Sequence, residues 1–254
     1  MKALVIIKSM GIGDLCILIS NIHEISRQIS QPVTVLAQQN TRAKTILKHD
    51  PYVEEVIELD DKEIKGFFNI IKILKSKKFD LCYIYSDSVR LYLISKLSNI
   101  KEIFHYKFFS KKGKNFFNTA KKFTEKILNT QINPQSKIYW DKNDIEKAKK
   151  KHNITPGTIN FIANVSASGP TKRWDIENYI KLFEELNKKN KSKFFITGGK
   201  NDENLIKKVM DSSVSKICVP LIQMDISEII PIIGACNFGI GNDTGFSHIS
   251  SGLG

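Results

Sequence analysis

Apolar residues recur along this chain with two periods, and its N-terminal part displays both. Residues 3–7 form an uninterrupted apolar run, which is typical of a strand buried on both faces. A glycine-containing loop follows, and leucine or isoleucine then recurs at every third or fourth position, at Leu15, Leu18, Ile22, Ile25 and Ile29. This spacing places the five side chains on one face of a helix. The pattern predicts the opening of a βαβ unit.

The same alternation continues through both halves of the chain. We predict further strands at 32–37, 52–59, 79–85, 158–165, 193–197, 216–219 and 238–240. We predict further helices at 41–48, 64–75, 89–97, 143–152, 176–189, 203–210 and 226–235. Residues 52–59 alternate between apolar and polar, as an exposed edge strand does. The expected fold class is α/β, with mostly parallel sheets and helices on both faces.

The pattern loosens between residues 131 and 140, where Asn133-Pro134-Gln135-Ser136 is typical of a turn. We place a domain boundary there and expect Rossmann-like domains at 1–139 and 140–254, facing one another across a cleft. Ligands of such sheets bind beyond the carboxyl ends of the strands. Polar loops at those ends are therefore the first candidates for function.

Composition narrows the class of protein. The four cysteines are far apart and form no Cys-x-x-Cys pair, which argues against a zinc ribbon or a disulfide framework and favours a reducing compartment. The N-terminal apolar run is too short for a signal peptide, and no run is long enough to cross a membrane. The formal net charge of +13 favours polyanionic neighbours.

The segment 101–126 concentrates this charge, with eight lysines and two acidic residues among seven aromatic residues. It fits an amphipathic helix with ordinary packing, a patch at a membrane surface, or a nucleic-acid surface. No RNA-binding signature or zinc finger accompanies it. Nucleic acid is therefore the least favoured of the three partners.

Gly11-Ile12-Gly13-Asp14 resembles a dinucleotide fingerprint, but Cys16 stands where the third glycine would be, so we discount NAD binding. Asp14 either caps the following helix or projects into the cleft, where its carboxylate could take a proton from an attacking hydroxyl.

Three later loops offer groups for an anion or a sugar. The segment 166–174 supplies small hydroxylated residues together with Lys172 and Arg173. The segment 197–203 contains a glycine pair and Asp202, for which we favour capping of the next helix over binding of a sugar hydroxyl. The segment 239–248 has the form of a strand, a tight loop and a helix N-terminus, which suits an anion.

The alternative for the last loop is that Asp243 or Thr244 only caps the helix and that His248 lies on its surface. The sequence contains no Asp-x-Asp, His-Glu-x-x-His, Gly-x-Ser-x-Gly or Walker loop. A bound diphosphate would therefore have to be neutralised by helix N-termini and Lys172 rather than by a metal.

These segments occur in the order seen in the ADP-heptose:lipopolysaccharide heptosyltransferases, glycosyltransferase family 9. The chain resembles that family in Gly-x-Gly-Asp at 11–14, Gly-Pro-Thr-Lys-Arg-Trp at 169–174, the glycine pair at 198–199 and Asp-Thr-Gly-x-x-His at 243–248. The second of these motifs is most similar to the heptosyltransferase II branch. Asp175 stands where that branch usually has proline, and we expect the second domain to be incomplete at its C-terminal end.

The resemblance implies a GT-B fold, an N-terminal acceptor domain and a C-terminal nucleotide-sugar domain. It also implies metal-independent, inverting transfer of heptose from ADP-heptose to the inner core of lipopolysaccharide, with no cofactor. On this basis Asp14 is the expected general base, and Lys172 is expected to meet the diphosphate. The full set of expected site residues is Asp14 and Lys172 as catalytic, Ser168, Thr171, Lys172, Gly199, Asp202, Asp243, Thr244, Gly245 and His248 as donor-binding, and Gly13, Arg90 and Lys107 as acceptor-binding.

The expected partners are an ADP-sugar donor and an anionic, lipid-linked saccharide acceptor, with no nucleic acid. The expected location is the cytoplasm, and peripheral contact with the inner membrane stays open. Two other functions are left as alternatives, namely an inactive nucleotide-sugar-binding protein and a basic nucleic-acid-binding protein.

Overall fold

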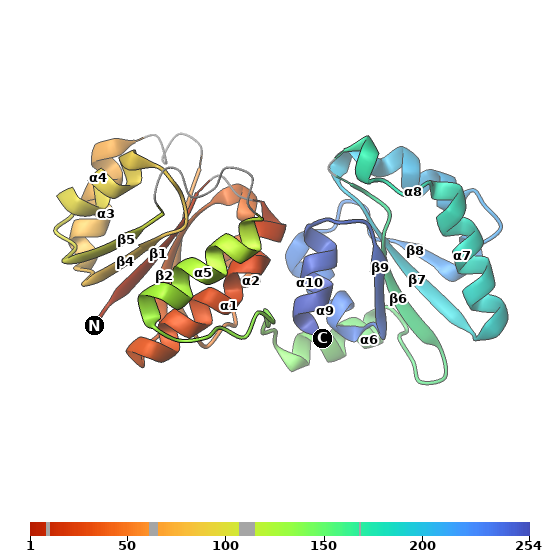
Figure 1. Cartoon of the computed structure of the whole chain (residues 1–254). Helices are drawn as coiled ribbons and strands as arrows, with labels where there is room; N and C mark the ends of the chain where they lie inside the picture. The colour runs from red at the N-terminus through yellow and green to blue at the C-terminus, as the bar shows by residue number, and fades with distance from the viewer. Residues whose placement is uncertain (9–10, 61–65, 107–114, 168) are drawn as a thin grey trace. The chain divides into compact units, whose positions relative to one another are not determined.

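The apolar run at the N-terminus forms the central strand of a parallel sheet. All five residues of β1 (Ala3–Ile7) are at most 2% exposed, as expected for a strand covered on both faces. The computed structural model describes all residues except 9–10, 61–65, 107–114 and 168 (Figure 1). Within the described residues, the chain divides into two units, Met1–Tyr139 and Trp140–Gly254.

Unit 1 alternates strands and helices around a five-stranded sheet with the order β3-β2-β1-β4-β5. Every pairing in this sheet is parallel. Its described elements are β1, α1 (Ile12–Ile29), β2 (Val33–Gln38), α2 (Ala43–Ile46), β3 (Val53–Leu59), α3 (Phe67–Lys77), β4 (Leu81–Ile84), α4 (Val89–Leu97), β5 (Glu102–His105) and α5 (Phe116–Leu128).

Helices cover both faces of this sheet. Leu4 and Ile6 of β1 pack with residues of α3 and α4 in one buried cluster. Because side chains alternate along a strand, the residues between them face the other side, where α1 and α5 pack together. Thr124 of α5 donates a hydrogen bond to the Asn21 side chain of α1 over 2.9 Å, which ties the two helices together.

Unit 2 repeats this architecture with a four-stranded parallel sheet of order β8-β7-β6-β9. Its described elements are α6 (Lys142–Lys151), β6 (Ile159–Asn164), α7 (Ile176–Lys189), β7 (Ser192–Thr197), α8 (Glu203–Met210), β8 (Cys218–Pro220), α9 (Ile226–Ala235), β9 (Phe238–Gly241) and α10 (Gly245–Leu253). One face packs against α7 and α8 around stacked Phe161, Phe183 and Phe194. The other is covered by α6, α9 and α10 (Figure 1).

Most predicted elements are present, and the differences have local causes. The strand predicted at 52–59 is an edge strand, since β3 ends the sheet order. The helix predicted at 41–48 is shorter, because a 3-10 turn at Gln39–Thr41 precedes α2. β5 was not predicted, because it is a short edge strand within the basic and aromatic segment.

The segment 101–126 contains β5 and most of α5, which packs as an amphipathic helix. Ala120, Thr124 and Leu128 are buried on one side of α5, whereas Lys122 and Lys126 are exposed. The first of the three interpretations therefore fits the described part of this segment, and membrane contact stays a prediction. Among the described residues, no helix has the length and apolar content needed to span a membrane.

Candidate functional site

Three loops of unit 2 follow adjacent parallel strands. β6 pairs with β7 on one side and with β9 on the other, so the segments that follow these strands meet at one edge of the sheet. They are residues 165–175 after β6, 198–202 after β7 and 242–244 after β9. All predicted donor-binding residues that the structure describes belong to these loops or to the start of α10.

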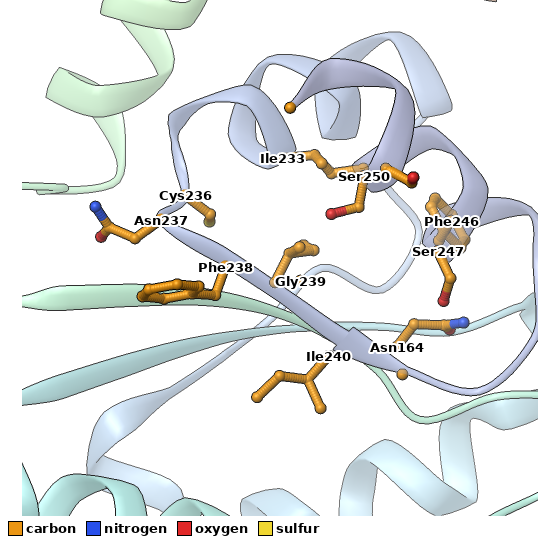
Figure 2. A pocket seen from close by; sticks show the side chains of 14 residues that line it. Asn164, Ile233, Cys236, Asn237, Phe238, Gly239, Ile240, Phe246, Ser247 and Ser250 are labelled. Carbon is orange, nitrogen blue, oxygen red and sulfur yellow. The ribbon is translucent and has the colours of Figure 1, made fainter. Parts of the chain in front are cut away.

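A pocket of about 360 Å³ lies between β9 and α10 (Figure 2). The strand and the helix approach closely here: a Cβ on Gly239 would lie 2.2 Å from Ser250 Oγ, and one on Gly241 would lie 3.0 Å from Ser247 Oγ. None of the described charged residues predicted for the donor site lines this pocket. The pocket is therefore distinct from the site formed by Lys172, Asp243 and His248.

Lys172, Asp243 and His248 form one charged cluster. Lys172 Nζ lies 2.9 Å from Asp243 Oδ2, and His248 Nε2 lies 3.3 Å from Asp243 Oδ1. The hydrogen bond and charge of Lys172 hold the pKa of the Asp243 carboxyl below its ordinary value, and His248 contributes less. The lysine and aspartate side chains are 53% and 64% exposed, so water screens the pair and it stabilises the fold little. Lys172 and Asp243 thus present opposite charges to solvent at the ends of the strands.

Thr244 directly precedes α10, and Gly245 is the first residue of that helix. The Thr244 hydroxyl accepts a hydrogen bond from the Asn164 side-chain amide and makes no bond to the helix backbone. The alternative in which Thr244 caps the helix with its side chain is therefore wrong. Amides in the first turn of a helix have no carbonyl partner within the helix, so the start of α10 offers donors and a positive dipole end. That combination suits a phosphate group.

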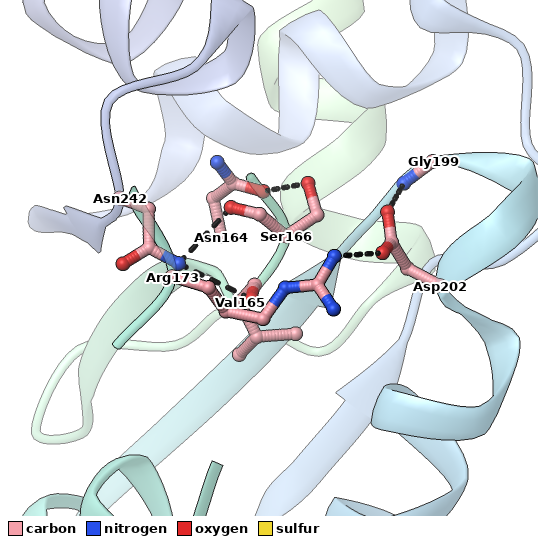
Figure 3. Close-up of polar contacts among 7 residues, drawn as sticks. All are labelled: Asn164, Val165, Ser166, Arg173, Gly199, Asp202 and Asn242. Atoms are coloured by element: carbon pink, nitrogen blue, oxygen red, sulfur yellow. Dashed lines mark hydrogen bonds and ion pairs between the residues drawn. The ribbon is translucent and has the colours of Figure 1, made fainter. Parts of the chain in front are cut away.

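Asn242 joins two of the three loops (Figure 3). Its side-chain amide donates to the carbonyl oxygens of Val165 over 3.2 Å and Ser166 over 3.0 Å, and its Oδ1 accepts from the Trp174 backbone amide over 3.0 Å. The asparagine is 8% exposed, so losing it would leave these backbone groups without their partner. These bonds fix the start and end of the segment that carries Lys172.

Asp202 contributes locally and across the sheet (Figure 3). Its Oδ2 accepts from the Gly199 amide over 2.9 Å, and its Oδ1 lies 3.2 Å from Arg173 Nη2. The carboxylate therefore holds the 3-10 turn before α8 and makes no side-chain bond at the start of α8 itself. Asp202 occupies the N-cap position of α8, as expected, but its side chain caps the 3-10 turn that leads into this helix.

In unit 1, Asp14 and Gly13 lie in the first turn of α1, and Arg90 lies in the first turn of α4. β1 and β4 are neighbours, so both helix starts are at the same edge of their sheet. Asp14 Oδ2 accepts from the Gly11 amide over 3.1 Å. Asp14 thus caps α1 from its third residue, and whether it is also a base stays a prediction.

Three further predicted residues complete the set. Thr171 lies exposed in the 3-10 turn Pro170–Lys172. Ser168 and Lys107 lie outside the described residues. Among the residues that the structure does describe, no three His, Cys, Asp or Glu side chains are grouped so that they could hold a metal ion.

Sequence reasoning missed the roles of Asn164 and Asn242. Asn164 is the last residue of β6. Its side-chain amide donates to the Thr244 hydroxyl, and its Oδ1 accepts a hydrogen bond from the Ser166 hydroxyl over 3.0 Å. An asparagine at the end of an otherwise apolar strand was an available signal. Its partner Thr244 lies 80 positions away in the sequence, so the contact depends on the strand order and not on local spacing.

The chain is similar to known proteins in sequence and in structure. The model of glycosyltransferase family 9 (heptosyltransferase) matches residues 68–254. No curated protein sequence matches the chain significantly.

Several solved structures cover the whole chain. The ADP-heptose lipopolysaccharide heptosyltransferase II of E. coli has a TM-score of 0.76 at 18% identity, with 82% of its own length covered. A glycosyltransferase of family 9 from Veillonella parvula has 0.81 at 16% identity, with 78% covered. The E. coli heptosyltransferase WaaC in complex with ADP has 0.70 at 14% identity, with 85% covered.

These similarities establish an α/β fold of the GT-B type, as the sequence predicted. The family model covers well over half of the chain, including every loop of unit 2 described above. The chain belongs to glycosyltransferase family 9, the heptosyltransferase family, and is a glycosyltransferase.

Proposed function

We propose that this glycosyltransferase transfers a heptose from ADP-heptose to the inner core of lipopolysaccharide, with inversion and without a metal. One observation carries the proposal. Lys172 is paired with Asp243, which lies two residues before α10, so the lysine and the start of this helix are at the same edge of the sheet. An ammonium group and free helix amides are the groups that a diphosphate needs when no metal is present. The E. coli relative WaaC, whose structure contains ADP, supports an adenine nucleotide as the donor.

The transfer requires charge neutralisation at the leaving group. An acceptor hydroxyl attacks the anomeric carbon, the bond from that carbon to the diphosphate oxygen breaks, and its electron pair leaves with ADP. Lys172 and the amides of α10 would stabilise the added charge. A lysine about 4 Å from a phosphate oxygen contributes about 4 kcal/mol of Coulomb attraction at an effective dielectric of 20, before desolvation.

Asp14 would take the proton of the acceptor hydroxyl. Of its two oxygens, Oδ2 is bonded to Gly11, and among the described residues no partner is found for Oδ1. Gly13, Arg90 and Lys107 would contact the acceptor, for which we propose an anionic, lipid-linked saccharide met at the cytoplasmic face of the inner membrane. Thr171, Gly199, Asp202, His248 and Ser168 would complete the donor site.

The test is the affinity for ADP by calorimetry in the Lys172→Ala variant. Lys188→Ala is the matched control, because Lys188 is also an exposed lysine in an ion pair, 2.7 Å from Glu185, and lies in the last turn of α7 at the opposite edge of the sheet. We expect Lys172→Ala to weaken ADP binding at least tenfold and the control to leave it unchanged. Equal affinities for ADP in the two variants would show that Lys172 does not bind the nucleotide and would contradict the proposal.

A further inference from the structure

A groove of about 730 Å³ lies in unit 1 between β5 and α5. Its floor is apolar and comes from both elements, with Phe104 on the strand and Phe123 and Ile127 on the helix. These three side chains are partly exposed. The volume lies within the range of sites that enclose a small ligand.

The position of α5 beside β5 is fixed by packing against α1 and against two tyrosines of the sheet. Thr124 is buried against α1, and Phe123 makes edge-to-face contacts with Tyr85 and Tyr106 at ring-centroid distances of 5.4 and 4.6 Å. These contacts fix the helix at a set distance from the edge strand. Among the described residues, the apolar surface between them is therefore preformed, and a ligand would not have to create it.

Polar residues of one helix face border this floor. Asn118, Lys122 and Lys126 follow one another at a spacing of four residues, so they line the same side of α5 along the groove. Both lysines are exposed. An apolar floor with a cationic rim fits a ligand that has an aliphatic part and an anionic part.

The charge of this rim is not compensated by the neighbouring acids. Lys121 pairs with Glu125 over 3.6 Å, and Lys101 pairs with Asp80 over 3.0 Å. Within the described part of the chain, no carboxylate pairs with Lys122 or Lys126. Two adjacent, uncompensated ammonium groups at this spacing suit one phosphate.

We propose that this groove binds one anionic phospholipid-type molecule, with an aliphatic chain on the aromatic floor and its phosphate between Lys122 and Lys126. The proposal rests on the proposed function, since it assigns the lipid part of the acceptor to a place in unit 1. It commits to a lipid and not to free phosphate, because the apolar floor would contribute nothing to binding a free anion.

The experiment measures binding of the full chain to vesicles of phosphatidylcholine with and without phosphatidylglycerol at low salt. The double variant Lys122→Gln with Lys126→Gln should lose about 10- to 30-fold in affinity, because each lysine near an anionic surface contributes about 1 kcal/mol. Lys72→Gln with Lys75→Gln on α3 is the matched control, since both are exposed lysines that remove the same charge outside the groove. Equal losses in the two double variants would overturn the proposal.

A second variant separates the groove from general surface charge. Asn118→Trp places a bulky side chain at the groove from an exposed position and leaves the charge unchanged. We expect it to reduce lipid binding at least fivefold, and unchanged binding would show that no chain enters the groove. Inorganic phosphate should not compete with the vesicles.

The affinity for ADP is measured in parallel on every variant. It should stay constant, because none of these residues is in unit 2. Lipid binding without ADP binding in the parent chain would contradict the proposed function and leave the groove standing. ADP binding without lipid binding in the parent chain would overturn the assignment of the groove and leave the proposed function intact.

Discussion

Replacing Asp243 by asparagine tests whether its carboxylate competes with a diphosphate for Lys172. In the structure the Lys172 ammonium group is already paired with this carboxylate over 2.9 Å. An incoming diphosphate would have to share or displace that partner. Asparagine keeps the shape and one accepting oxygen, so the variant removes charge and little else.

The magnitude follows from exposure and distance. Both side chains are more than half exposed, so the ion pair contributes at most about 1 kcal/mol to stability, and the variant should unfold at nearly the parent urea concentration. A phosphate oxygen on the same ammonium group would lie about 6 Å from the carboxylate. Between dielectric constants of 80 and 20, the repulsion per unit charge is about 0.7 to 3 kcal/mol. We therefore expect ADP to bind Asp243→Asn about tenfold more tightly.

The assay is calorimetry with ADP at low and moderate salt, because the gain should shrink as ions screen the charge. Asp211→Asn is the control, since Asp211 is exposed at the end of α8 and lies at the opposite edge of the sheet from Asp243. If the carboxylate also accepts a hydroxyl of the donor sugar, the nucleotide sugar should gain less than ADP. An affinity for ADP equal to that of the control, or weaker, would refute the competition.

Three further predictions concern other parts of the chain. Asp14→Asn keeps an oxygen for the Gly11 amide, so it should leave ADP affinity intact and lower turnover about 100-fold in a steady-state assay, whereas equal loss of both would indicate a structural cap. Asn242→Ala should cost about 2 to 4 kcal/mol in urea unfolding because three bonds are lost, while Asn201→Ala at an exposed position should cost under about 0.5 kcal/mol. Burial raises the pKa of the Cys16, Cys82 and Cys218 thiols to about 12, so iodoacetamide should label these three in urea and leave them unlabelled in the native protein.

The hydrophobic pattern was enough to predict the parallel sheets, because their strands are buried and their helices amphipathic. β1 is a continuous run of apolar residues, and the apolar residues of α1 recur at spacings of three and four. β5 escaped prediction because only four residues, two of them polar, form this strand at the sheet edge. Its pairing with β4 is a contact between distant segments that no local period reveals.

For the candidate site, the sequence was enough to predict which loops follow the strands, but not which of these loops contact one another. Lys172 and Asp243 could be placed at strand ends from the sequence, but their contact could not, since it requires β9 to lie beside β6. The same holds for the bond between Asn242 and the Trp174 amide. The strand order determines which loops meet, and the order depends on long-range packing.

The two glycine-aspartate turns of this chain show how geometry separates a structural carboxylate from a candidate base. In Gly11-x-x-Asp14 and in Gly199-x-x-Asp202, the aspartate Oδ2 accepts from the glycine amide, over 3.1 and 2.9 Å. Asp202 uses its second oxygen for Arg173 at 3.2 Å. Asp14 has, among the described residues, no partner for its second oxygen. An oxygen already bonded to arginine is not available to a substrate hydroxyl. The local bond thus orients both carboxylates, and within the described residues Asp14 is the one whose second oxygen is left to meet an acceptor hydroxyl, as the proposed role of general base requires.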